Sequence, residues 1–208
     1  MSRLTLFLLI GFCLITISTI AQETELEALE DINNYIEEKD NYFKDPETSP
    51  LNSKDLAEFK NLEYFSINLN FRVKAKFEKH PIVKLFYMKT STDRLSKYGR
   101  FAELSFEIEG KTYRLQAYQS QSLIGTEGYE NYLFIPFTDL TSGNTTYGGG
   151  RYMDIDIPEG DEITLDFNKT YNPYCAYNIK YSCPVPPREN DLNIEILAGV
   201  KAPNDGDH

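Results

Sequence analysis

The chain alternates apolar and polar residues throughout positions 65–77, which read FSINLNFRVKAKF. Every odd position carries Phe, Ile, Leu, Val or Ala, and the even positions carry Ser, Asn, Arg or Lys. Strict alternation places one kind of side chain on each face of an extended strand. We therefore expect a long β-strand here, with one face buried in a core.

Further strand-like stretches follow, separated by turn residues such as Glu109-Gly110-Lys111. They are expected at residues 82–89, 101–109, 112–118, 132–137, 151–157, 163–167 and 192–197. Consecutive strands without intervening helices are typical of antiparallel sheets. The predicted fold class is all-β, an antiparallel β-barrel or β-sandwich of about eight strands with an N-terminal helical arm.

The arm is predicted from helical spacing between residues 23 and 44. Its apolar residues share one helical stripe, which we expect to cover the β domain: Leu26, Leu29, Ile32, Ile36 and Phe43. Pro46 ends this helix, and Ser53 is the expected cap of a short second helix.

The first 21 residues have the pattern of a secretory signal peptide. Arg3 precedes an apolar run, and Thr19-Ile20-Ala21 ends it with the small residues that a signal peptidase prefers. An uncleaved membrane anchor is the alternative. The predicted organisation is a signal peptide (1–21), a helical arm (22–62), a β domain (63–200) and a disordered tail (201–208). This organisation predicts a secreted or periplasmic protein, with no membrane insertion once the signal is removed.

The charge balance narrows the function classes. The formal net charge is −11, and removal of the signal takes away Arg3 and leaves −12. Such a chain offers no excess of cations to a phosphate backbone, so we expect no nucleic-acid partner and little attraction to anionic lipid. Only His80 and His208 are present, which leaves little material for histidine catalysis or metal binding.

Two cysteines, Cys175 and Cys183, remain after signal removal. An even pair in an oxidising compartment predicts a disulfide, with inert thiols and a catalytic cysteine as the alternatives. The bond would close a short ring and contribute on the order of 2.5 kcal/mol through the entropy of the unfolded chain.

The last third of the chain carries three dense motifs. They are YGGGRY with a following aspartate at 147–154, DFNKTYNPYCAYN at 166–178, and CPVPPREN at 183–190. With these motifs the chain resembles, from Lys39 to Gly199, an uncharacterised bacterial family known as a domain of unknown function. Tyr174 stands where members often carry a second proline. The resemblance implies no established activity and no cofactor.

A candidate ligand site follows from the residues of these motifs. The three glycines at 148–150 suit a turn into a strand or a ligand loop, and Arg151 suits a carboxylate or phosphate. If Arg151 points inward it needs a partner, and Asp154 and Asp166 are the nearest candidates in the sequence. Tyrosines of this region could stack on a ligand or pin loops through their hydroxyls. The expected ligand-binding residues are Tyr147, Arg151, Asp154, Asp166, Asn168, Tyr171, Tyr177 and Asn178.

The predicted function is non-catalytic binding of a small molecule or a protein partner, with no metal. The alternative is a hydrolase, acting on a glycan for example, that uses two of Asp154, Asp166 and Glu189 as acid and base. A third interpretation is a structural envelope protein without a pocket. A calcium site formed by Asp154, Asp156, Asp161 and Asp166 is a weaker alternative, because their spacing matches no known loop.

Overall fold

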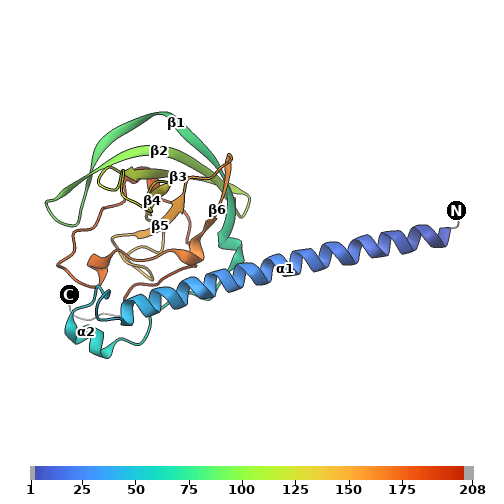
Figure 1. The fold of residues 1–208 in the computed structure, drawn as a ribbon, viewed down its shortest axis with the longest axis horizontal. Coiled ribbons are helices and arrows are strands. Elements are labelled where there is room, and N and C mark those ends of the chain that lie inside the picture. Colours follow the sequence, from blue (N-terminus) through green and yellow to red (C-terminus); the bar gives the residue numbers. More distant parts are fainter. Residues whose placement is uncertain (1–2, 204–208) are drawn as a thin grey trace.

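The computed structural model describes the backbone of residues 3–203 and the side chains of residues 24–203. Helix α1 (Arg3–Lys44) and helix α2 (Ser53–Glu58) precede a single six-stranded antiparallel sheet (Figure 1). The strands are β1 (Arg72–Lys89), β2 (Leu95–Ile108), β3 (Lys111–Ser120), β4 (Tyr132–Phe137), β5 (Arg151–Asp156) and β6 (Glu162–Asp166). Their order in the sheet is β5-β4-β3-β2-β1-β6.

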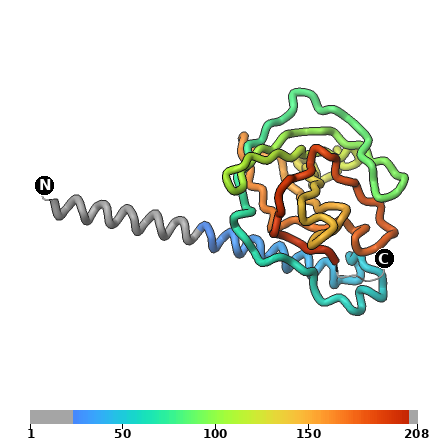
Figure 2. The backbone as a smooth tube through the Cα atoms, turned by 180° about the vertical axis from the view of Figure 1, so that it is seen from behind, coloured from blue at the N-terminus to red at the C-terminus, as the bar shows by residue number. Residues whose placement is uncertain are grey.

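The fold is mostly β, and the sheet curls into a half-barrel. The predictions of about eight strands and of a closed barrel or two-sheet sandwich were wrong. The C-terminal segment that follows the sheet crosses the open side of the curl (Figure 2). Leu192, Ile196 and Ala198 of this segment are buried in the core that the sheet surrounds. A loop therefore completes the interior that further strands would complete in a barrel.

Two strands that were predicted separately, at 65–77 and 82–89, form one continuous strand. Residues 72–89 form β1 without a break at Pro81, because a register shift separates the pairs Lys79–Ala102 and Lys84–Arg100. The shift leaves residues 80–83 unpaired with β2, so a proline costs no ladder hydrogen bond there. The start of the alternating stretch, residues 65–71, is not part of a strand.

Residues 65–71 do not form a strand because asparagine side chains bind their backbone N–H and carbonyl groups. Asn68 caps a short 3₁₀ turn, Leu69–Phe71, by accepting a hydrogen bond from the Asn70 N–H at 3.0 Å. Its own backbone N–H and carbonyl bind the side chain of Asn168. The predicted last strand, residues 192–197, is likewise an extended loop, since its backbone bonds go to single residues such as Thr138 and Leu140.

The predicted tight turn between β2 and β3 is confirmed. Ile108 pairs with Lys111, so Glu109 and Gly110 alone form the loop. Both have positive φ, 52° and 72°, which is the two-residue geometry that suits the twist of a hairpin.

The sheet has two cores, one on each face. In the first half of β1, Ala75 and Phe77 face the main core inside the curl. Beyond the shift, Phe86 and Met88 face the opposite side of the sheet, where they pack with Tyr98, Tyr118 and Tyr152. The segment around Cys183 covers this second core. One long hairpin therefore packs on both faces, at different points along its length.

Helix α1 docks on the domain through the expected stripe, but only in part. Ile32 and Phe43 are buried, whereas Leu26 is 60% exposed. Asp31 anchors the same helix by ion pairs to Lys169 and Arg72 at 2.6 and 3.3 Å. The short helix α2 starts at Ser53 as expected, but its cap is Asn52, which accepts from the Lys54 and Asp55 N–H groups.

Among the described residues, no helix combines the length and the apolar character that a membrane span needs. The expected signal peptide, residues 1–21, lies outside the described side chains, and residues 204–208 of the expected tail lie outside the described backbone. Within the rest of the tail, the Lys201 N–H donates to the Glu63 carbonyl at 2.8 Å.

Candidate functional site

Arg151 lies in the interior and is 1% exposed. Its guanidinium donates to the Asp139 carboxylate at 3.1 Å and to the carbonyl of Ile196 at 3.0 Å. It also donates to the carbonyls of Ala198 and Val200. The expected partners in the sequence, Asp154 and Asp166, were therefore wrong. Burial lowers the pKa of Arg151 to about 10, and the Asp139 charge opposes this shift, so the group is still cationic at neutral pH.

Arg151 therefore ties three parts of the chain together. It belongs to β5, Asp139 belongs to the turn after β4, and the carbonyls belong to the C-terminal segment. The Asp139 carboxylate also accepts from the Ile196 N–H at 2.7 Å, so each charge has several partners. These hydrogen bonds offset the cost of burying the two charges. Because Arg151 is enclosed by its partners, its guanidinium is not accessible to a ligand.

The three glycines form the turn that delivers Arg151 to the interior. Gly150 has φ of 85°, and a Cβ at this position would lie 2.5 Å from the Phe137 carbonyl oxygen. Only glycine combines that φ with so close an approach to β4. The turn into a strand is thus the better description of 148–150 than a ligand loop.

Asp166 and Asn168 form a second clamp, at the end of β6, which is the edge strand opposite to β5 in the sheet order. Asp166 binds Arg72 at 2.5 Å and caps the turn Phe167–Lys169 by accepting from the Asn168 N–H. The Asn168 side chain exchanges two hydrogen bonds with the backbone of Asn68, at 2.9 and 3.1 Å. Asp166 and Asn168 are buried, and the structure does not bring them to Arg151.

Asn172, Tyr177 and Asn178 lie together beneath α1. Asn172 donates to the Tyr177 hydroxyl at 3.0 Å and to the Lys201 carbonyl at 2.7 Å. Asn178 donates to the Pro50 carbonyl at 3.1 Å, which fixes the chain between the two helices. Tyr177 also meets the ring of Phe43 edge-on, with 4.9 Å between centroids.

Asp154 and Tyr171 form a third group, at the side of β5. The carboxylate of Asp154 accepts from the hydroxyls of Tyr132 and Tyr171, each at 2.8 Å. One side of Asp154 is exposed, yet the protein packed around the carboxyl raises its pKa, and the two tyrosine bonds and Lys39 only partly oppose this. The ammonium of Lys39 lies over the rings of Tyr35 and Tyr171, 5.3 and 4.9 Å from their centroids.

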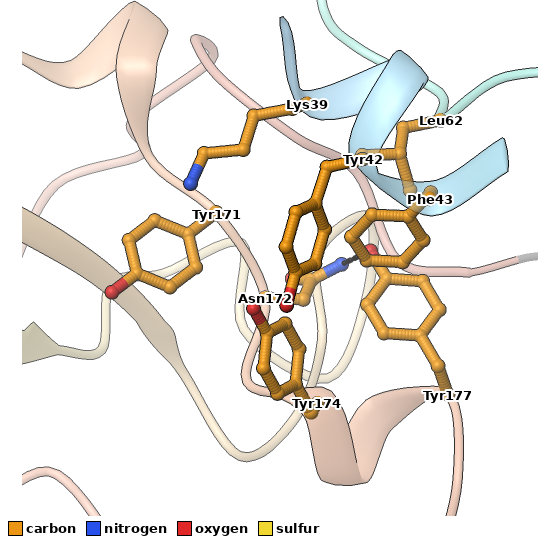
Figure 3. Close-up of a pocket in the computed structure, with 8 residues that line it drawn as sticks. All are labelled: Lys39, Tyr42, Phe43, Leu62, Tyr171, Asn172, Tyr174 and Tyr177. Atoms are coloured by element: carbon orange, nitrogen blue, oxygen red, sulfur yellow. Dashed lines mark hydrogen bonds between the residues drawn. The ribbon is translucent and has the colours of Figure 1, made fainter. Parts of the chain in front are cut away.

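A small hollow opens between this group and α1 (Figure 3). Its free volume is about 20 Å³, which is room for about one water molecule. The residues that line it come from the end of α1, from the segment after α2 and from residues 171–177: Lys39, Tyr42, Phe43, Leu62, Tyr171, Asn172, Tyr174 and Tyr177. The rings of Tyr42 and Tyr174 are nearly parallel, with 6.2 Å between centroids, and Tyr42 is 37% exposed.

Most of the surface that lines the hollow is apolar, and one of its polar groups lacks a hydrogen-bond partner. Asn172 is 2% exposed, and its Oδ1 has no hydrogen-bond partner. The hydroxyls of Tyr35 and Tyr64, which lie in the same region between α1 and the domain, are also buried without partners. Burial raises the pKa of both tyrosines, so they are neutral hydroxyl groups. We call this region, defined by Lys39, Tyr42, Tyr171, Asn172 and Tyr174, the tyrosine hollow.

Tyr147 does not line the hollow, but it packs against the cluster of Phe43, Leu62 and Tyr177 behind it and lies beside Cys175. Its hydroxyl is 3.9 Å from the sulfur of Cys175. Both cysteines are free thiols in the structure, so the predicted disulfide is not formed in it. They are nonetheless neighbours, since the Cys175 N–H donates to the Cys183 sulfur at 3.2 Å. A hydrogen bond from the Cys183 thiol lowers the pKa of Cys175 and raises that of Cys183.

Asn190 is a structural residue that the sequence analysis missed. Strands β3 and β4 pair only at Tyr118–Phe134, and Asn190 fills the gap between them. It is fully buried, accepts from the Gln116 N–H at 2.7 Å, and donates to the carbonyls of Gln116 and Pro136. Glu189 beside it binds Arg100 and the Tyr118 hydroxyl.

The acidic residues do not assemble a metal centre. Within the described part of the chain, no three His, Cys, Asp or Glu side chains lie close enough together to hold an ion, which removes the calcium alternative. Each carboxylate of the hydrolase alternative has separate partners: Asp154 binds tyrosines, Asp166 binds Arg72, and Glu189 binds Arg100. His80 bonds to Gln116 at 2.8 Å, away from both cysteines.

Comparison with known proteins identifies relatives without a known activity. Residues 57–201 match the family model described as "Protein of unknown function (DUF1684)", a match that starts later than the expected Lys39. A comparison with curated proteins finds no match. Among solved structures, the chain is similar to the uncharacterized protein from gene locus rrnAC0354 of Haloarcula marismortui, determined by solution NMR. The identity is 36%, the TM-score is 0.64, and the match covers 92% of this chain and 98% of the other. The family model spans more than half of the chain and this relative nearly all of it, and the protein therefore belongs to the DUF1684 family.

Proposed function

We propose that the protein is a non-catalytic binding domain that acts outside the cytoplasm and holds a small polyhydroxylated ligand, such as a sugar, at the tyrosine hollow. The orphaned Oδ1 of Asn172 carries this proposal, because a buried acceptor without a partner costs free energy that a donor from a ligand would recover. The proposed function is the one expected from the sequence. Two of the expected site residues, Tyr171 and Tyr177, line the hollow, whereas Arg151 does not.

The geometry of the hollow favours a hydroxyl-bearing ligand. The space beside Asn172 admits a group the size of one water molecule, which fits a hydroxyl and excludes a ring. The rest of such a ligand would lie outside, on the exposed ring of Tyr42 and beside the Lys39 ammonium (Figure 3). Tyrosine rings supply flat apolar area with little entropy to lose, which suits the faces of sugar rings.

The hydrolase alternative has less support than ligand binding. General acid and base residues must reach the same substrate, and the candidate carboxylates are engaged in separate clamps. The terminal nitrogens of Arg151 and the amide of Asn168 likewise bind the protein itself, although the Nε of Arg151 is buried without a partner. Most residues of the family motifs hold irregular backbone in place, and Asn172 is the residue at the hollow whose buried acceptor lacks a partner.

The test is a titration with a panel of neutral and amino sugars, read by thermal shift and by amide chemical shifts. We expect a hit whose binding weakens at least ten-fold in Tyr42→Ala, because the variant removes the exposed ring without opening the core. Tyr129→Ala is the matched control, since Tyr129 is similarly exposed at 43% but lies in the loop before β4. Equal loss in both variants, or no hit in the panel, would contradict the proposal.

We also propose that Cys175 and Cys183 join as a disulfide after export. The contact between the Cys175 N–H and the Cys183 sulfur supports this, as does the lowered pKa of Cys175, since the thiolate is the form that attacks. Intact mass of protein secreted into an oxidising compartment should fall by two hydrogens relative to the reduced chain. A mass that accounts for two free thiols after export would refute it.

A further inference from the structure

The far end of the β1–β2 hairpin carries four large apolar side chains in water. Ile82 is 78% exposed, Leu85 51%, Tyr87 63% and Leu95 56%. They fall within fourteen residues of the chain, where an ordinary solvent-facing strand would alternate with polar residues. Such a concentration of exposed apolar surface is typical of a site that binds a partner or a membrane.

The register places three of these side chains on one face. Leu85 pairs with Gly99, Tyr87 with Lys97, and Lys89 with Leu95, and directly paired residues share a face of an antiparallel sheet. A Cβ on Gly99 would meet the Val83 and Leu85 side chains at 2.5 and 3.4 Å, so these apolar groups lie over the bare backbone of β2. The other face of the hairpin packs on the second core through Phe86 and Met88.

Two cations lie on this apolar face. Lys89 and Lys97 are exposed, and within the described residues neither of them forms an ion pair. We call this face the hairpin surface, which consists of Leu85, Tyr87, Lys89, Leu95 and Lys97, with Ile82 beside it.

The charge of the chain is divided between two regions. Residues 72–100 carry nine Lys and Arg against two acidic residues, a net of +7. Residues 24–63, which form the docked end of α1, α2 and their connections, carry twelve acidic residues against four Lys, a net of −8. The overall charge of −11 therefore conceals a basic β1–β2 segment, which meets the acidic α1 at its start through Arg72 and Asp31 and then curves over the domain away from that helix (Figure 1).

We propose that the hairpin surface docks on the anionic face of a lipid bilayer. Exposed Leu, Ile and Tyr with lysines around them match the interfacial region of a membrane, where apolar groups enter the headgroup layer and lysines stay at its surface. Each lysine near an anionic surface contributes about 1 kcal/mol. The acidic helical side would face away from the lipid, so the separation of charge orients the molecule.

A bilayer fits this surface better than a folded acidic protein does. The apolar side chains project from a strand face, and the hollow that the structure shows lies elsewhere, under α1. A fluid surface accepts projecting side chains without a complementary shape, whereas a protein partner has to supply one. This peripheral docking differs from insertion, and it is independent of ligand binding at the tyrosine hollow.

The chain contains no tryptophan, which makes the test direct. In Leu95→Trp the single indole reports on the hairpin surface, and in Leu140→Trp it reports on the turn after β4. Both positions are 56% exposed, so the two variants are matched in free solution. The probe is vesicles of phosphatidylglycerol with phosphatidylcholine, compared with vesicles of phosphatidylcholine alone.

We expect a blue shift of Leu95→Trp emission with the anionic vesicles only, reversed by high salt, and no shift for Leu140→Trp. Replacing Lys89 and Lys97 with Gln should weaken partitioning about 25-fold, five-fold for each lysine. Far-UV circular dichroism would establish that these exposed substitutions leave the fold intact. No shift with anionic vesicles, an equal shift with neutral vesicles, or binding of soluble polyglutamate in place of vesicles would each overturn the proposal.

Discussion

Replacing Arg151 with Met should destabilise the protein strongly, because it removes the cation from a buried ion pair. The variant keeps the apolar part of the side chain but leaves the Asp139 carboxylate without its counter-charge and the Ile196 carbonyl without a donor. Breaking a buried pair from one side costs about 3–5 kcal/mol. Asp139 keeps its bonds from the Ile196 N–H and the Thr141 hydroxyl, so the middle of that range, about 4 kcal/mol, is expected.

The matched control is Arg114→Met. Arg114 also pairs with a carboxylate, Glu103, at 3.4 Å, but 68% of its side chain is exposed. An exposed pair of this kind contributes about 0–1 kcal/mol. For a chain of this length, a loss of about 4 kcal/mol corresponds to a fall in Tm of roughly 8–16 °C.

Urea unfolding followed by circular dichroism measures both variants. Adding Asp139→Asn to Arg151→Met should cost less than the sum of the two single changes, since both charges then leave together. If Arg151→Met cost no more than Arg114→Met, the guanidinium would not be a structural cation, and a ligand role for it would have to be reconsidered.

Three further predictions follow from individual contacts. Asn190→Ala should cost more than 3 kcal/mol in urea unfolding, because it leaves the buried Gln116 N–H and two carbonyls without partners; a cost near zero would refute the bridging role. The pKa of Asp154 is raised by burial, so the folded state holds its proton more tightly than the unfolded state and the residue's contribution to stability falls as the pH rises above about 4. Asp154→Asn should therefore gain in stability relative to the native chain between pH 4 and 7, and a difference that is constant with pH would contradict this assignment. Iodoacetamide should label the reduced protein first at Cys175, whose pKa is lowered, and preferential labelling of Cys183 would refute the direction of that shift.

The sequence correctly predicted those features of the fold that depend only on neighbouring residues. The alternation through Phe77 marks a strand because side-chain direction depends only on neighbouring residues, and Glu109-Gly110 marks a hairpin because few residues tolerate positive φ. The prediction of separate strands at 65–77 and 82–89, on either side of Pro81, was wrong. A proline is acceptable where a register shift removes the ladder bond, and that shift depends on the partner strand.

The candidate site was harder to predict because its residues are distant in the sequence. An inward Arg151 was only one of the options that the motifs allowed, and its partner, Asp139, lies in a turn without a recognisable motif. Lys39 and Tyr42 belong to the tyrosine hollow only because α1 docks beside residues 171–177, which is a tertiary contact. The apolar stripe of the arm was the available signal, since it indicated that the helix covers the β domain.

The exposure of the hairpin surface could not be predicted from the sequence either. Leu85 and Tyr87 belong to residues 82–89, for which the sequence predicted a strand without indicating which face is buried. In this part of β1 the face with Phe86 and Met88 packs on the second core, and Leu85 and Tyr87 on the other face are exposed. Total composition could not reveal the basic hairpin either, because the acidic helical side outweighs it in the net charge.

The most direct test of the binding proposal is a map of amide chemical shifts on titration with the tightest sugar of the panel. The account predicts that the largest changes fall at Lys39, at Tyr42 and in residues 171–177, while residues 148–151 stay unchanged. Changes centred on Gly148–Arg151, with the tyrosine hollow unaffected, would contradict it.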